Sequence, residues 1–73
     1  MKLASLKEGG RDGTLIVVNR DLTRGVRATG IAATLQLALE SWGSVAPRLN
    51  ALFEGLQAGK VSDAFDLDVD KLA

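Results

Sequence analysis

With 73 residues the chain has the length of one small domain, and it contains no histidine, no cysteine and no tyrosine. Without cysteine there are no disulfides, and the usual ligands of a structural zinc site are missing as well. Nine basic residues balance nine acidic ones, and this zero net charge argues against a protein whose main task is to hold nucleic-acid phosphates. A core of this size rarely supplies more than about 3–5 kcal/mol, so we expect support from a second copy or a neighbouring domain.

The first part of the chain predicts three antiparallel strands. Residues 2–7 alternate loosely and predict an edge strand, and the glycine-rich segment 8–13 predicts a turn with positive φ. Thr14–Val18 is a continuous apolar run, which is typical of a strand buried on both faces. A turn signal at residues 19–21 separates it from a third strand over residues 22–28. We therefore expect a meander with the apolar run as its middle strand.

After residue 30 the apolar period changes from that of a strand to that of a helix. Thr34 is a candidate N-cap, and Gly59 lies where a C′ glycine commonly ends a helix. Seven apolar residues between them are separated alternately by four and three positions, which predicts one side of a long helix: Leu35, Leu39, Trp42, Ala46, Leu49, Phe53 and Leu56.

Pro47 lies inside this helical stretch, where a proline costs about 3 kcal/mol and clashes with the carbonyl of Gly43. Either one helix is kinked near these two residues, or two helices meet there, with Ser44 as the N-cap of the second. We favour the kinked helix because the apolar stripe keeps its phase through Pro47. Beyond Gly59, residues 61–73 have weak periodicity and predict an extended tail or a short helical turn.

These elements predict a single α+β domain over residues 1–73, in which a three-stranded antiparallel meander packs against a long helix kinked or split near Pro47. No apolar run approaches the roughly 18 residues of a membrane span. The start of the chain is positive but lacks the apolar core of a signal peptide, because charge returns at Lys7. We therefore expect a cytoplasmic protein that does not enter a membrane.

Two segments superficially resemble ion-binding loops. Asp66, Asp68 and Asp70 alternate as in a calcium loop, but the sixth position, which is glycine in such loops, is Lys71. Residues 9–13 are rich in glycine, but they lie between two expected strands and lack the lysine of a phosphate-binding loop. We interpret the acidic segment as a solvated tail and the glycine-rich segment as a hairpin loop.

Arg11, Arg20, Arg24 and Arg27 make the first part of the chain basic and are candidates for binding an anion. In the expected third strand, Arg24 shares a face with Val26, and Arg27 points to the other face. Sheets that bind nucleic acid normally interleave aromatic residues, and this region has none. We favour a solvated or domain-facing basic surface; the alternative is a free-standing interaction module that uses Arg20, Arg24 and Arg27 to hold an acidic partner or nucleic acid.

The remaining candidates have structural explanations. Trp42 and Phe53 lie on the apolar stripe and are expected in the core. Glu40 and Glu54 are about 21 Å apart along one helix, which is too far for an acid/base pair. Three serines have no histidine to activate them as nucleophiles: Ser41, Ser44 and Ser62. We therefore assign no catalytic, cofactor-binding or metal-binding residue.

The most specific combination in the chain is RDGTLIVVNRDL at residues 11–22, followed by W-x-x-V-A-P-x-L at residues 42–49. Further matching segments are residues 1–7, 31–36, 39–42 and 64–68. Together, and in this order, they resemble the opening of bacterial fumarylacetoacetate hydrolase family proteins. The resemblance spans essentially the whole chain, although no single segment is a catalytic signature.

This resemblance implies a small N-terminal domain that precedes a much larger catalytic domain. Proteins of this family hydrolyse carbon–carbon bonds in acylpyruvate-like substrates or act on related keto acids. They use Mg²⁺ or Mn²⁺ held by carboxylates, with a His/Glu pair that activates water, and these residues belong to the catalytic domain.

The resemblance therefore implies a hydrolase as the parent protein and a chain that by itself holds no cofactor or metal and is inactive. Its expected partner is the catalytic domain of the same protein or a second copy. Leu37 and Val45 lie off the main apolar stripe and are candidates for that contact.

Overall fold

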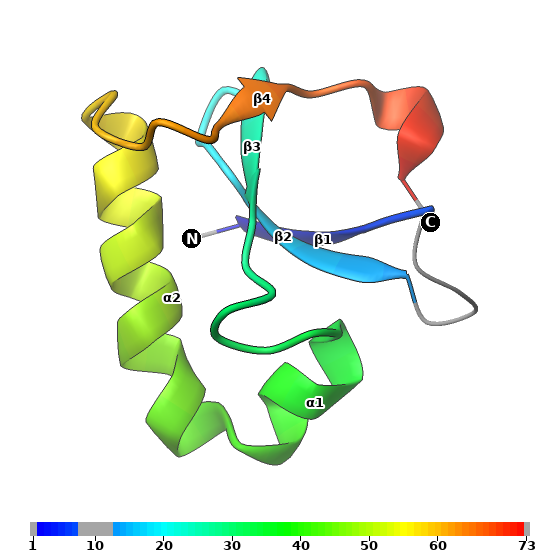
Figure 1. Cartoon of the computed structure of the whole chain (residues 1–73), viewed down its shortest axis with the longest axis vertical. Helices are drawn as coiled ribbons and strands as arrows, with labels where there is room; N and C mark the ends of the chain where they lie inside the picture. Colours follow the sequence, from blue (N-terminus) through cyan, green and yellow to red (C-terminus); the bar gives the residue numbers. More distant parts are fainter. Residues whose placement is uncertain (1, 8–12, 73) are drawn as a thin grey trace.

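Residues 2–7 and 13–72 are described by the computed structural model, which shows an α+β domain built on an antiparallel sheet (Figure 1). Within these residues the sheet has four strands in the order β1-β2-β3-β4: β1 is Lys2–Leu6, β2 is Thr14–Val18, β3 is Arg24–Arg27 and β4 is Phe65–Asp66. The helices are α1 (Leu35–Glu40), α2 (Trp42–Gln57) and a short 3₁₀ helix, Val69–Lys71. The α+β class is confirmed, and the expected three-stranded meander has a fourth strand. None of the described helices has the length and apolar character needed to cross a membrane.

β2 lies inside the sheet, and all of its residues are buried. It pairs with β1 along one side, where Ser5 lies opposite Leu15, and with β3 along the other. Because successive side chains alternate between the faces of a strand, Leu15 and Val17 face the helices, and Ile16 and Val18 face the opposite side. The prediction of a strand buried on both faces is confirmed.

The side chain of Asn19 builds the turn between β2 and β3. Its Oδ1 accepts hydrogen bonds from the backbone N–H groups of Thr23 at 2.9 Å and Arg24 at 3.1 Å, and its Nδ2 donates to Oγ1 of Thr23 at 2.9 Å. Leu22 lies inside this turn with a φ of 60°. The predicted turn is therefore confirmed but longer than expected, and the third strand begins at Arg24 instead of residue 22.

The long helix expected from the apolar stripe is two helices that meet at Ser41. Ser41 has a φ of −127° and a ψ of 35°, and its carbonyl accepts the N–H of Val45 at 3.0 Å, which starts α2 anew. The split thus precedes Pro47, and Ser44 is not the N-cap. Pro47 lies within α2 and has no N–H to donate to the carbonyl of Gly43. Because Gly43 is exposed, water can hydrogen-bond to that carbonyl instead.

Near the break the buried residues differ by one position from the predicted stripe, whereas Leu49, Phe53 and Leu56 are buried as predicted. The buried residue of α1 is Ala38 instead of Leu39, and the buried side of α2 begins at Val45 instead of Ala46. Leu39 and Trp42, which the predicted stripe placed in the core, expose 61% and 40% of their surfaces. The spacing of the apolar residues does not reveal this difference, because it fits an uninterrupted helix that buries Leu39 and Trp42.

Both predicted helix ends are confirmed. Thr34 is the N-cap of α1, and its hydroxyl accepts the N–H of Leu37 at 3.2 Å. Gly59 follows α2 with a φ of 71°, and the N–H groups of Gly59 and Lys60 bond back to the last turn at 3.1 and 2.9 Å. This is a Schellman motif, which requires a residue with positive φ at the position of Gly59.

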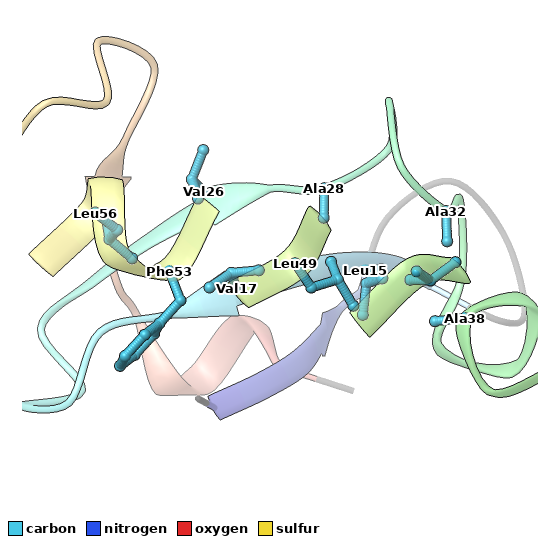
Figure 2. Close-up of a cluster of buried hydrophobic side chains, with 10 residues drawn as sticks. Leu15, Val17, Val26, Ala28, Ala32, Ala38, Leu49, Phe53 and Leu56 are labelled. Carbon is cyan, nitrogen blue, oxygen red and sulfur yellow. The ribbon is translucent and has the colours of Figure 1, made fainter. Parts of the chain in front are cut away.

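The main core lies between the sheet and the helices (Figure 2). Its largest contributions from the sheet are Leu15, Val17 and Val26, and those from α2 are Leu49, Phe53 and Leu56. Leu49 is completely buried, and Phe53 is buried as its place on the stripe predicted. The second half of the stripe therefore serves the purpose that its spacing indicated.

The opposite face of the sheet is covered by the chain's own C-terminal segment, residues 65–72. Phe65 in β4 pairs with Gly25, and an added Cβ on Gly25 would lie 3.3 Å from the Phe65 ring. From β4 the segment passes across this face, and Leu72 forms an antiparallel bridge with Leu6 of β1. The segment expected to be a solvated tail is instead a second layer of the fold.

Candidate functional site

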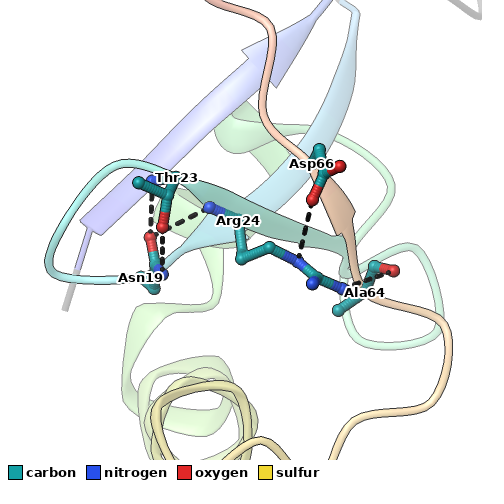
Figure 3. A network of polar contacts seen from close by, with 5 residues as sticks. All are labelled: Asn19, Thr23, Arg24, Ala64 and Asp66. Carbon is teal, nitrogen blue, oxygen red and sulfur yellow. Dashed lines mark hydrogen bonds and ion pairs between the residues drawn. The ribbon is translucent and has the colours of Figure 1, made fainter.

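Arg24, one of the predicted anion-binding residues, contacts the C-terminal segment of its own chain (Figure 3). Its Nη2 donates to the carbonyl oxygen of Ala64 at 3.1 Å, and its Nε lies 3.6 Å from Oδ1 of Asp66. Both charged side chains are substantially exposed, so the ion pair contributes at most about 1 kcal/mol. Arg24 therefore helps to hold β4 beside β3.

Arg27 lies on the face of β3 that Phe65 covers, and its guanidinium carbon is 5.1 Å from the centre of the Phe65 ring. Arg20 is exposed, and its backbone N–H donates to Oε1 of Gln57 at 2.7 Å. Arg11 lies outside the described residues. Because Arg24 and Arg27 point to opposite faces and contact the protein's own chain, the structure does not support the alternative of an interaction module with one basic sheet face.

A hollow of about 410 Å³ opens beside Arg27 and Phe65, near the end of β1. The residues around it come from β1, β3 and the C-terminal segment: Leu6, Lys7, Arg27, Phe65, Asp66, Asp68, Asp70 and Lys71. Three basic side chains face three acidic ones, so their formal charges cancel. The hollow therefore selects neither an anion nor a cation by its net charge.

The three aspartates of the suspected calcium loop are exposed. Oδ1 of Asp68 accepts the backbone N–H of Asp70 at 3.0 Å, which stabilises the start of the 3₁₀ turn. Across residues 2–7 and 13–72, no three ligating side chains are grouped so that they could hold a metal ion. Asp66 pairs with Arg24 and Asp68 with the backbone of Asp70, so both contact their own chain.

Three large apolar side chains are exposed on α1 and at the start of α2, and we call them the helix corner: Leu37, Leu39 and Trp42. The expectation that Trp42 lies in the core is wrong, because Trp42 is the first residue of α2 and 40% of its surface is exposed. Val45, expected at a partner surface, is buried in the core, whereas Leu37 is exposed as expected. The residues of the helix corner are the large apolar side chains that α1 and α2 leave exposed.

The other candidates do not come together. Glu40 ends α1 and Glu54 lies in α2, and both are exposed. The three serines considered as nucleophiles are also exposed: Ser41, Ser44 and Ser62.

Of the glycine-rich segment, only Gly13 belongs to the described residues, and residues 9–12 of the predicted hairpin loop lie outside them. Gly13 has a φ of 72°, and an added Cβ would lie 2.6 Å from the carbonyl oxygen of Leu6. Close contact with β1 therefore requires glycine at this position.

The sequence did not lead us to expect that the C-terminal segment packs against the sheet. Phe65 and Leu67 pack against the sheet, and exposed aspartates alternate with them. This period of two is the signal that identifies an extended, half-buried segment. In so short and acidic a segment, the same pattern is also compatible with a solvated tail.

The chain is thus a small α+β domain with exposed apolar side chains at the helix corner. Its described residues contain no group of side chains that could hold a metal ion. The family model of the fumarylacetoacetase N-terminal domain 2 matches residues 1–73, and the chain belongs to this family. The resemblance carried by the sequence is thereby confirmed at the level of the family. No curated protein matches the chain.

Proposed function

We propose that this chain is the non-catalytic N-terminal domain of a fumarylacetoacetate hydrolase-family enzyme and that it packs against the catalytic domain of the same protein. The family match over the whole chain carries the proposal. The parent reaction is metal-dependent hydrolysis of carbon–carbon bonds in acylpyruvate-like keto acids, with Mg²⁺ or Mn²⁺ bound in the catalytic domain. The described residues provide no set of ligands for that metal, so no chemical step is assigned to them.

The helix corner supports the packing part of this proposal. Leu39 and Trp42 expose 61% and 40% of their surfaces. Covering these two side chains removes roughly 200 Å² of apolar surface from water, which is worth at most about 5 kcal/mol. That free energy is comparable to what the core of so small a domain supplies, so a neighbouring domain would strongly stabilise the fold.

Trp42 is the only tryptophan of the chain and therefore reports directly on this contact. We expect the ¹⁹F resonance of 5-fluorotryptophan at Trp42 to shift when the separately produced catalytic domain is added to the labelled chain. Leu39→Ala should weaken that binding several-fold. A resonance that stays unchanged at saturating catalytic domain, with Trp42 still accessible to a soluble quencher, would contradict packing at the helix corner.

The assignment to a larger enzyme has two direct tests. The reading frame is expected to continue beyond Ala73 into a second domain rich in histidine and carboxylates. The purified 73-residue chain, supplied with Mn²⁺ and an acylpyruvate, is expected to show no turnover, and measurable turnover would overturn the non-catalytic role. Sedimentation across a wide concentration range separates the two possible partners, because packing against a second copy makes the oligomeric state depend on concentration.

A further inference from the structure

We propose that the polypeptide continuing from Leu72 runs along the free edge of β1 as a fifth, antiparallel strand. The domain would then be joined to the catalytic part by backbone pairing and not by a flexible linker. This inference rests on the proposed function, because it requires a polypeptide that continues into a catalytic part. It is carried by the register of the C-terminal segment, the orientation of the β1 backbone and the hollow beside it.

The C-terminal segment already reaches the outer edge of β1 in the antiparallel direction. The N–H of Lys7 donates to the carbonyl oxygen of Lys71 at 2.8 Å, and Leu6 forms an antiparallel bridge with Leu72. In Figure 1 the C-terminal end of the chain lies beside the end of β1. In this register, each further residue of the chain falls opposite the preceding residue of β1.

The backbone of β1 is oriented to accept such a strand. The N–H of Leu15 donates to Ala33 at 3.1 Å, and its carbonyl accepts the N–H of Ala28 at 2.9 Å, so both groups of Leu15 point away from β1. Ser5 lies opposite Leu15, and its own N–H and C=O must therefore face outward.

Leu3 has the same orientation as Ser5, because the hydrogen-bonding direction alternates along a strand. Among the described residues, the outer edge of β1 is paired only at Leu6 and Lys7. An edge strand with unpaired groups is a template for an additional strand.

An apolar hollow of about 340 Å³ lies next to this edge. Its lining contains one charged residue among six apolar ones: Lys2, Leu3, Ala4, Val18, Leu22, Leu67 and Leu72. In the proposed register, the side chain opposite Ala4 points to the same face as Leu72 and toward this hollow. We therefore expect an apolar residue at that position of the continuing strand.

Leu22, on the rim of the hollow, adds an independent observation. It is 51% exposed and has a φ of 60°, a conformation that costs a non-glycine residue about 1–2 kcal/mol. The turn at Asn19 sets this backbone conformation, and a strand that covers the hollow would bury the exposed Leu22 side chain.

The continuing chain fits the edge better than a second copy of the domain. Lys71 and Leu72 already occupy one end of the edge, and a strand from another molecule would have to stop before them. A segment attached at Leu72 is delivered to the edge at a high effective concentration and forms the strand without loss of translational freedom.

Hydrogen exchange at Leu3 tests the inference, with Ala4 as the internal control, because its N–H faces β2. In the full-length parent protein the Leu3 amide is expected to exchange at least about tenfold more slowly than in the 73-residue chain, while the Ala4 amide changes far less. The same protection is expected when the chain is extended by only the next six or so residues of the parent. Equal Leu3 exchange in all three proteins would overturn the inference.

Two further outcomes would also overturn it. Protection of Leu3 that appears only with the whole catalytic domain would assign the edge to that domain's body, and protection that grows with the concentration of the 73-residue chain would assign it to a second copy. Failure of the proposed packing is separately visible, because the Trp42 resonance then stays unchanged while Leu3 protection in the extended chain persists.

Discussion

Replacing Phe65 by alanine tests whether the C-terminal segment is an integral layer of the fold. The Phe65 ring is half-buried and lies against Gly25. The guanidinium carbon of Arg27 lies 5.1 Å from the centre of this ring. A fully buried Phe→Ala change costs about 3–5 kcal/mol, and half burial brings this to roughly 2 kcal/mol. Loss of the exposed cation–π contact adds about 0.5 kcal/mol.

For a domain of this length, a loss of 2 kcal/mol lowers Tm by roughly 8–16 °C. Urea and thermal unfolding followed by circular dichroism measure this change without relying on Trp42, which is exposed. Asp66→Ala is the matched control, because Asp66 lies next in β4 and loses only an exposed ion pair, worth at most about 1 kcal/mol. Equal stability of the two variants would refute the conclusion that residues 65–72 cover the sheet.

Three further tests address other parts of the structure. Leu49→Ala should lower the free energy of unfolding by about 3–4 kcal/mol because Leu49 is fully buried, whereas Leu39→Ala should lower it by less than about 0.5 kcal/mol because Leu39 is exposed. Similar losses for the two variants in urea titrations would contradict the two-helix arrangement. Gly59→Ala should cost about 1 kcal/mol because of its positive φ, and calorimetry showing an unchanged Tm would argue against the Schellman motif. Ser5→Pro should be tolerated in the 73-residue chain because it removes an outward N–H, while Ala4→Pro should unfold it; circular dichroism showing the reverse would mean that the β1 register is wrong.

The sheet was largely predictable because its signals are local. The apolar run Thr14–Val18 and the turn residue Asn19 determine their conformations mainly through contacts with near neighbours in the chain. The same holds for the caps Thr34 and Gly59, where one side-chain or backbone geometry satisfies the groups at a helix end.

The helix break was not predictable from spacing. Leu39 and Trp42 continue a regular apolar stripe, and only the tertiary structure shows that Ala38 and Val45 are buried near the break while Leu39 and Trp42 are exposed. Pro47 attracted the prediction of a break because it is the visible helix-breaking residue. The chain changes direction earlier, at Ser41.

The candidate site divides in the same way. Composition established that the chain has no histidine or cysteine for chemistry, and the family resemblance was confirmed over all 73 residues. The role of Arg24 and Arg27 was not visible, because their partners, Ala64, Asp66 and Phe65, lie some forty residues further along the chain.

The sequence by itself determined the α+β class, the buried middle strand, the helix ends and the family of this protein, because each depends on local periodicity, turn chemistry or the order of motifs along one chain. Tertiary structure alone decided that the helix divides at Ser41, that Trp42 is exposed and that residues 65–72 form a second layer. The physical reason is that a strand apolar on both sides needs two covers, and one helix pair covers one face only. Which segment supplies the second cover depends on contacts between residues far apart in the chain.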